Sequence, residues 1–129
     1  MGEAVITLPL PPTVNHVWKH TVRGRRACVY MSAEGKAYRQ HVGLECNRQQ
    51  VSGLKLSGRL VVRVGLAFPD RRRCDIDNRL KALFDGLTAA GVWLDDSQID
   101  ELFVARLPVS SESKAKGGYA VIDIKELAA

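Results

Sequence analysis

The sequence has few cysteines and no long apolar segment. Its three cysteines, Cys28, Cys46 and Cys74, are far apart and odd in number, which argues against a disulfide framework and for a reducing compartment. The longest apolar run, residues 61–68, is interrupted by Arg63 and is too short to cross a bilayer. The N-terminus lacks the charged start, long apolar stretch and cleavage site of a signal peptide. We therefore expect a cytoplasmic protein without membrane contact.

The signatures of several enzyme classes are also missing. No Gly-x-x-x-x-Gly-Lys-Ser/Thr motif occurs, so the use of ATP is not indicated, and no Ser/His/Asp arrangement for acyl transfer stands out. His16 and His20 have a spacing that can bind a metal ion on a helix. Two prolines precede them and no third soft ligand is evident, which argues against a zinc site.

What is present is an ordinary globular composition with an excess of positive charge. The chain has 129 residues, of which 46% are hydrophobic and 26% charged, so we expect one domain over residues 1–129 with a core that needs no covalent staples. The net charge is +5 and the pI is about 9.4. A polyanionic partner, nucleic acid first, is consistent with this charge, although many basic proteins bind none.

The N-terminal half contains signals for a strand, a loop and a long helix. Residues 4–8 predict a short strand, which the prolines that follow bring to an end. Residues 13–25 predict a basic loop, with which the β-rich residues 27–31 can pair as a short strand. Ser32 is a suitable N-cap for a helix from Ala33 to about Gln50.

The C-terminal half alternates strands and helices. Apolar residues at every second position predict a strand over 59–68, and helical spacing from Ile76 to Leu87 predicts a helix that Gly91 stops. Residues 99–107 are apolar on both faces, which predicts a central strand. A Ser/Lys/Gly loop over 110–118 and a last strand around Ala120, Ile122 and Ile124 follow. The order predicts an α+β fold: a single domain with one mixed β-sheet covered by two helices.

The segment RRRCDIDNRLK, residues 71–81, sets bases directly beside acids. On a regular helix Asp75 and Asp77 would lie about 200° apart, too far to share an ion. If the helix begins at Asp75, both carboxylates can converge at its start. Asp95 and Asp96 lie in a turn after the helix, and the sequence alone does not decide whether this turn returns to Asp75.

Two interpretations of this acidic set remain open. Carboxylate oxygens suit Mg²⁺ shared with a substrate phosphate, with Lys81 stabilising developing charge and Arg71, Arg72 and Arg73 gripping neighbouring phosphates. Alternatively, the aspartates only cap a helix and form an ordinary turn, and Lys81 is a solvated side chain. Spacing alone leaves the second interpretation ahead, because Asp-x-Asp is common.

The run over residues 69–102 resembles the RusA family of Holliday junction resolvases. The motifs that carry the resemblance are the basic stretch, Asp75-Ile76-Asp77-Asn78, Lys81, Phe84-Asp85-Gly86-Leu87-Thr88 and Trp93-Leu94-Asp95-Asp96. Ile6 to His20, Ser32 to Arg39 and the late Pro-Val loop are also similar to the family, so that nearly the whole chain is covered. The departures are Ile76 for the usual Leu and Cys74 for a frequent Arg.

The resemblance implies a Mg²⁺-dependent endodeoxyribonuclease, with Mn²⁺ able to substitute, that resolves four-way DNA junctions as a homodimer by paired symmetric nicks. It assigns metal binding and catalysis to Asp75, Asp77 and Asp96, and a catalytic role to Lys81. The rival hypotheses are a module that binds branched DNA without cutting it, and a general nuclease for flaps or forks.

Two further basic segments are candidates for DNA contact. The residues of the first, between positions 15 and 26, are Asn15, His16, Lys19, His20, Arg23, Arg25 and Arg26, with Trp18 able to stack on a base. A merely solvated loop is an equal alternative for this segment. In the second, Lys114, Lys116, Gly117 and Gly118 are suited to holding a phosphate or to forming a flexible hairpin turn.

Overall fold

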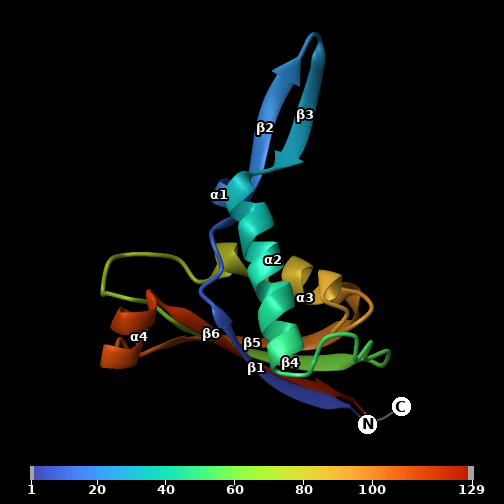
Figure 1. Ribbon diagram of the computed structural model, residues 1–129, viewed down its shortest axis with the longest axis vertical. Coiled ribbons are helices and arrows are strands. Elements are labelled where there is room, and N and C mark those ends of the chain that lie inside the picture. Colours follow the sequence, from blue (N-terminus) through green and yellow to red (C-terminus); the bar gives the residue numbers. More distant parts are fainter. Residues whose placement is uncertain (1, 128–129) are drawn as a thin grey trace.

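A four-stranded mixed sheet forms the base of the molecule. The computed structural model describes residues 2–127, and its strands β1 (Glu3–Pro9), β4 (Leu60–Ala67), β5 (Ile99–Leu107) and β6 (Tyr119–Glu126) have the order β1-β6-β4-β5. The β4–β5 pair is parallel and the other two pairs are antiparallel. Helices α2 (Ala33–Arg48) and α3 (Leu80–Ala89) lie together on one face of this sheet (Figure 1). The predicted α+β fold with two covering helices is confirmed.

The core lies between this sheet face and the two helices. Alternate strand residues such as Ile6, Val62 and Ile122 are fully buried there, which is the period expected of strands with one covered face. From the helices, Val42 and Leu87 are equally inaccessible. The helices approach closely at Gly86, where an added Cβ would lie 3.2 Å from side-chain atoms of Val42. The apolar periodicity therefore predicted the core correctly.

Residues 13–25 do not form the expected loop. They contain a short helix, α1 (Val14–Val17), and a strand, β2 (Trp18–Arg23), which pairs in antiparallel fashion with β3 (Arg26–Met31). The expected pairing with residues 27–31 is confirmed, but the result is a separate two-stranded hairpin that projects from the body along its long axis (Figure 1). The strand was missed because β2 is largely polar, with Trp18 and Val22 its only apolar residues, and so lacks an apolar face. Gly24, at φ 63°, and Arg25 form the two-residue turn that joins it to β3.

The long helix follows the prediction at its start. The Ser32 Oγ accepts a hydrogen bond from the N–H of Gly35 at 3.1 Å, as an N-cap should, and the helix ends at Arg48 rather than near Gln50. Residues 110–118 were wrongly expected to be a loop only. They contain the helix α4 (Ser111–Lys116), in which Ser110 and Ser113 form a reciprocal capping box.

Two other expectations were wrong. The third helix does not begin at Asp75: a 3-10 turn, η1 (Asp77–Arg79), comes first, and α3 starts only at Leu80. Strand β5 is not central but lies at the edge of the sheet, with Phe103 52% exposed. The sequence of β5 has apolar residues on both faces because Phe103 lies on the sheet face that α2 and α3 do not cover. There the guanidinium of Arg63 lies 5.0 Å from the centre of the Phe103 ring.

No helix within residues 2–127 has the length and apolar character needed to cross a membrane.

Candidate active site

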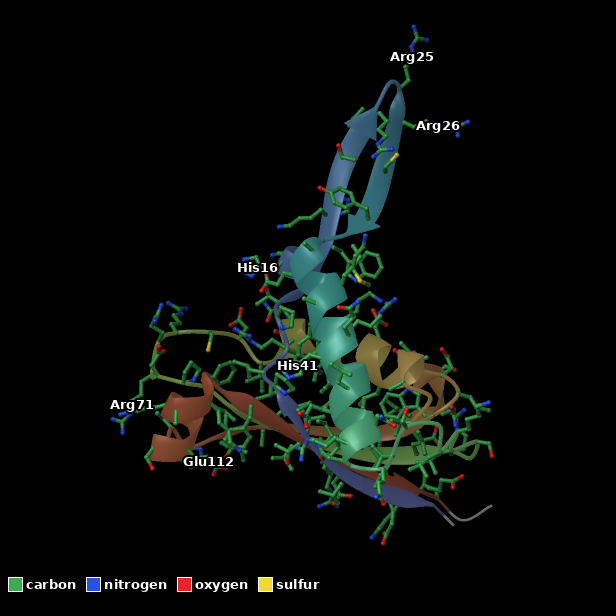
Figure 2. All side chains as sticks on the ribbon, in the orientation of Figure 1. His16, Arg25, Arg26, His41, Arg71 and Glu112 are labelled. Carbon is green, nitrogen blue, oxygen red and sulfur yellow. The ribbon has the colours of Figure 1, made fainter. Side chains whose placement is uncertain are left out.

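The arginine-rich segment forms an irregular loop that leaves the end of β4. Phe68, buried at the end of the strand, is followed by residues 69–76 without helix or strand. Asp70 stabilises the loop locally, because its carboxylate accepts the N–H of Arg72 at 2.9 Å and pairs with the Arg72 guanidinium at 3.0 Å. These contacts hold the pKa of Asp70 below its ordinary value. The side chains of Arg71, Arg72 and Arg73 are exposed, and Figure 2 shows that of Arg71 at the outer bend of the loop.

The loop borders an open cavity of about 540 Å³ that is rich in guanidinium groups. The lining includes Phe68, the loop residues from Asp70 to Cys74, and Arg106 to Val109, which follow from the end of β5. Because β4 and β5 are parallel, their carboxyl ends meet at one edge of the sheet, and four arginines are gathered there. Such a concentration of fixed positive charge suits an oligoanion such as a DNA backbone.

The three aspartates implicated by the sequence are all exposed. Asp75 ends the loop, Asp77 is the first residue of η1, and Asp96 is the first residue of a second 3-10 turn, η2 (Asp96–Gln98), after α3. Within residues 2–127 no hydrogen bond or ion pair occupies these three carboxylates, unlike those of Asp70 and Asp100. Free, hard oxygen donors fit a divalent cation such as Mg²⁺.

Asp95 is engaged in holding the turn. Its carboxylate accepts the N–H of Ser97 at 3.1 Å, and hydrogen bonding to Ser97 keeps the pKa of Asp95 below its ordinary value. The amide oxygen of Gln98 accepts the N–H groups of Leu94 and Asp95, while its NH₂ donates to the carbonyls of Leu56 and Gly58. Asp95 is thus a capping residue, whereas the equally exposed carboxylate of Asp96 takes no hydrogen bond within residues 2–127.

The described residues do not form a complete metal site. No group of three or more His, Cys, Asp or Glu side chains within residues 2–127 is close enough to hold one ion. The helix start at Asp75, through which the sequence hypothesis brought Asp75 and Asp77 together, is not present. Asp77 belongs to η1, which precedes α3, and Asp96 belongs to η2, which follows it, so that this helix lies between them along the chain.

Lys81 lies in the first turn of α3, close to Asp77 in sequence. Its ammonium is 3.4 Å from a carboxylate oxygen of Asp85 and 5.8 Å from the ring centre of Trp18. The ion pair is half exposed, so it holds Lys81 only weakly. Three buried polar atoms of the described chain lack a hydrogen-bond partner: two belong to Asn78 and Arg79 of η1, and the third to Trp18, whose ring lies near the Lys81 ammonium. The start of α3 therefore has unused polar groups beside Asp77.

The N-terminal DNA-contact candidates lie on the hairpin and its base. Asn15 and His16 are exposed on α1, and Lys19 on β2 donates to the carbonyl of Asn15 at 3.0 Å. Figure 2 shows Arg25 and Arg26 at the far tip of the hairpin, pointing away from the body. Arg23 and Arg26 are paired across the two strands. The tip thus concentrates positive charge with no acid near it in sequence.

Of the C-terminal candidates, only one lysine is engaged by an acid. Lys116 pairs with Glu112 at 2.9 Å, which raises the pKa of Lys116, and its ammonium lies 5.2 Å from the Tyr119 ring centre. Lys114 is exposed on the same helix, α4, which lies at the end of the sheet that carries the arginine loop (Figure 1). Residues 110–118 therefore form a short helix with capped ends rather than a flexible hairpin turn.

Sequence reasoning missed Arg106. Its guanidinium contacts the arginine loop at Cys74 and lies over the ring of Phe68. The available signal was the alternation of β5, which puts Arg106 on the same side as Leu102 and Val104 and so places a cation at the end of the covered face.

Comparison with known proteins agrees with this arrangement. The profile of the family described as Endodeoxyribonuclease RusA matches residues 9–122. The proteins named crossover junction endodeoxyribonuclease RusA from Escherichia coli K12 and from Enterobacteria phage 82 are each 41% identical over 127 residues, with 98% of both chains covered. A relative of the same name from Shigella sonnei has the same identity and coverage. The acidic residues, the arginine loop and the full-length similarity together show that the chain belongs to the RusA family of endodeoxyribonucleases.

Proposed function

We propose that the protein is a homodimeric endodeoxyribonuclease that uses Mg²⁺, or Mn²⁺ in its place, to nick four-way DNA junctions in two symmetry-related strands. The observation that carries the proposal is the pair of exposed carboxylates of Asp75 and Asp77, which within residues 2–127 take no hydrogen bond or ion pair and directly follow the arginine loop that lines the basic cavity. Exposed acids repel a phosphate backbone unless a cation lies between them, so their presence beside Arg71, Arg72 and Arg73 favours a metal-dependent cutter over a passive binding module.

The topology of a single chain supports a site shared by two chains. The ten residues of α3 span about 15 Å, and they separate Asp75 and Asp77 from Asp96. A second copy related by a two-fold axis can place Asp96 of the partner subunit beside Asp75 and Asp77 of the first. The same operation then completes an equal site on the other side. Two equal sites suit a substrate whose two cut strands are themselves related by symmetry.

In this site Asp75, Asp77 and the partner's Asp96 would hold the cation. When bound, Mg²⁺ supplies a water of lowered pKa and neutralises charge that develops on the phosphate. Lys81, held only by a weak ion pair with Asp85, is able to turn toward the same phosphate and donate to its oxygens. Arg71, Arg72 and Arg73 hold adjoining phosphates and orient the strand.

The remaining basic groups extend this surface along the DNA arms. Asn15, His16 and Lys19 at the base of the hairpin and Arg25 at its tip contact one arm, and Lys114 and Lys116 of α4 contact DNA near the arginine loop. The activity serves DNA recombination and repair in the bacterial cytoplasm, where chromosomal and phage DNA lie. A role as a general flap or fork nuclease is the alternative that the substrate controls must address.

A junction-cleavage assay tests the activity. The purified protein is incubated with a synthetic four-way junction in Mg²⁺ or in EDTA, with flap and linear duplex DNA as controls. Paired symmetric nicks in Mg²⁺ alone support the proposal, and Asp77→Asn should lose cleavage while still binding the junction. Binding in both conditions without nicks would favour a binding module, and equal cutting of flaps would favour a general nuclease.

A mixing experiment tests the shared site. Asp77→Asn and Asp96→Asn should each be inactive alone, but a mixed dimer should hold one site in which both residues are intact and one in which both are changed. Mixing should therefore restore nicking, whereas mixing Asp75→Asn with Asp77→Asn should not. Subunit exchange is checked with a tagged copy, and failure to restore activity despite exchange would contradict a shared site.

A further inference from the structure

Within residues 2–127, the arginine loop has one polar anchor outside its own residues, in addition to the packing of Cys74 and Ile76 against the core. Arg106, on β5, donates from Nη2 to the carbonyl oxygen of Cys74 at 2.5 Å, and its Nη1 lies 3.4 Å from the Cys74 Sγ. The loop's other side-chain hydrogen bonds, between Asp70 and Arg72, are internal to it. The two-point contact from Arg106 therefore fixes the loop immediately before Asp75.

Arg106 is itself held in place by aromatic packing. Its guanidinium carbon lies 4.7 Å from the ring centre of Phe68, which is only 3% exposed. The guanidinium of Arg79 lies 5.1 Å from the same ring and donates to the carbonyl of Pro11 at 2.7 Å. This stack joins the ends of β4 and β5 to η1 and to the segment after β1. Planar guanidinium groups stack on rings and present two fixed N–H donors, so lysine cannot reproduce the contact.

The peptide plane links this anchor to the candidate site. The carbonyl of Cys74 and the N–H of Asp75 belong to one planar peptide unit, so a donor that fixes the first also fixes the orientation of the second. Asp75 is otherwise exposed at the end of an irregular loop. Without the anchor, the backbone at Asp75 would be held only by the partial packing of Cys74 and Ile76 against the core, and ordering it on each encounter with a cation would cost more conformational entropy.

We propose that Arg106 is a positioning residue, which acts through the Cys74 carbonyl to hold Asp75 and the arginine loop in the orientation needed for cleavage. This proposal rests on the function proposed above for Asp75. The role differs from phosphate binding, because Arg106 holds the loop in the absence of DNA, whereas a phosphate contact forms only in the complex.

Three variants separate these roles. Arg106→Lys keeps the positive charge but loses the planar guanidinium with its two fixed N–H donors. Arg106→Gln loses both the charge and this geometry. Arg63→Gln is the matched control, because Arg63 also lies over an aromatic ring but on the other sheet face, away from the loop. Folding of each variant is checked by thermal unfolding, and Arg106→Lys carries the test if Arg106→Gln does not fold.

The first measurement is limited trypsin cleavage without DNA or metal. Cleavage after Arg71, Arg72 and Arg73 reports freedom of the loop, and cleavage at the hairpin-tip arginines in the same sample is the internal reference. Arg106→Lys and Arg106→Gln should both raise the ratio of loop to hairpin cleavage, while Arg63→Gln should not. An unchanged ratio in both Arg106 variants would overturn the proposal.

The second measurement compares junction nicking in Mg²⁺ with junction binding in EDTA. Loss of a group that orients a ligating residue typically reduces activity about 10- to 100-fold, and we expect this loss for Arg106→Lys with binding close to that of the unchanged protein. Wild-type nicking by Arg106→Lys would show that only the charge matters and would overturn the proposal. If the unchanged protein nicks no branched DNA, the proposed function fails separately, and the trypsin ratio alone decides whether Arg106 positions the loop.

Discussion

The carboxylate of Asp95 accepts the N–H of Ser97 at 3.1 Å, while that of its neighbour Asp96, equally exposed, accepts no hydrogen bond within residues 2–127. These two adjacent aspartates thus have different roles: Asp95 stabilises the η2 turn, and Asp96 is the proposed metal ligand.

Alanine at these two positions should separate the duties. Asp95→Ala removes an N-cap and should lower the free energy of unfolding by about 1 kcal/mol while leaving nicking largely intact. Asp96→Ala should leave the unfolding free energy nearly unchanged and abolish nicking. Urea denaturation and junction cleavage measure the two effects. If Asp95→Ala is the inactive variant and Asp96→Ala cuts normally, the assignment of the metal-binding residue is wrong.

Gly86→Ala should destabilise the protein, because α3 packs closely against α2 at this position. Alanine favours a helix over glycine by about 1 kcal/mol, but the new Cβ would lie 3.2 Å from three atoms of Val42, and overpacking of this kind costs about 1–3 kcal/mol. A Val42→Ala change removes two of these three atoms and keeps only Cβ, so Gly86→Ala should cost less in that background. A double-mutant cycle in urea measures this difference, and an equal effect in both backgrounds would argue against the close approach of α2 and α3.

Low pH should weaken the hydrogen bonds by which the Glu126 carboxylate holds the backbone of Gly2 and Gly58. The Glu126 carboxylate accepts the N–H groups of Gly2 at 2.8 Å and Gly58 at 2.9 Å, and these hydrogen bonds, that from Gly58 foremost, lower the pKa of Glu126 from its ordinary 4.5. A lowered folded-state pKa adds stability that is present above pH 4.5 and is lost as the pH falls below it through the folded-state value.

Glu126→Gln should therefore flatten the pH dependence of the thermal midpoint between neutral pH and the range below 4.5. Asp123→Asn on the same strand is the control, since its exposed side chain makes no comparable backbone contacts. An identical pH profile for Glu126→Gln and the unchanged protein would remove Glu126 from this role.

The hairpin tip should contribute to DNA affinity through charge alone. Arg25→Gln should weaken junction binding in EDTA and reduce the slope of log affinity against log salt by about 1, as expected for one lost phosphate contact. Lys125→Gln removes the same charge from β6, far from the tip, and should leave the slope unchanged. Equal slopes for Arg25→Gln and the unchanged protein would show that the tip does not contact DNA.

Local signals in the sequence were sufficient for most of the framework. Alternating apolar residues predicted β4 and β6, the Ser32 cap predicted the start of α2, and the order of elements predicted a mixed sheet under two helices. These predictions hold because side-chain periodicity and capping act over a few residues. The acidic and basic residue types of the candidate site were also visible, since Asp75, Asp77, Asp96 and the arginine loop lie in one contiguous segment.

Only the tertiary structure decided where these residues lie relative to one another. The 3-10 turn at Asp77 and the crossover through α3 separate Asp96 from Asp75, and the parallel pairing of β4 with β5 brings Arg106 to Cys74. Both relationships depend on which strands pair and in what direction. Such non-local pairings are set by burial across the whole sheet, which no short segment of the sequence records.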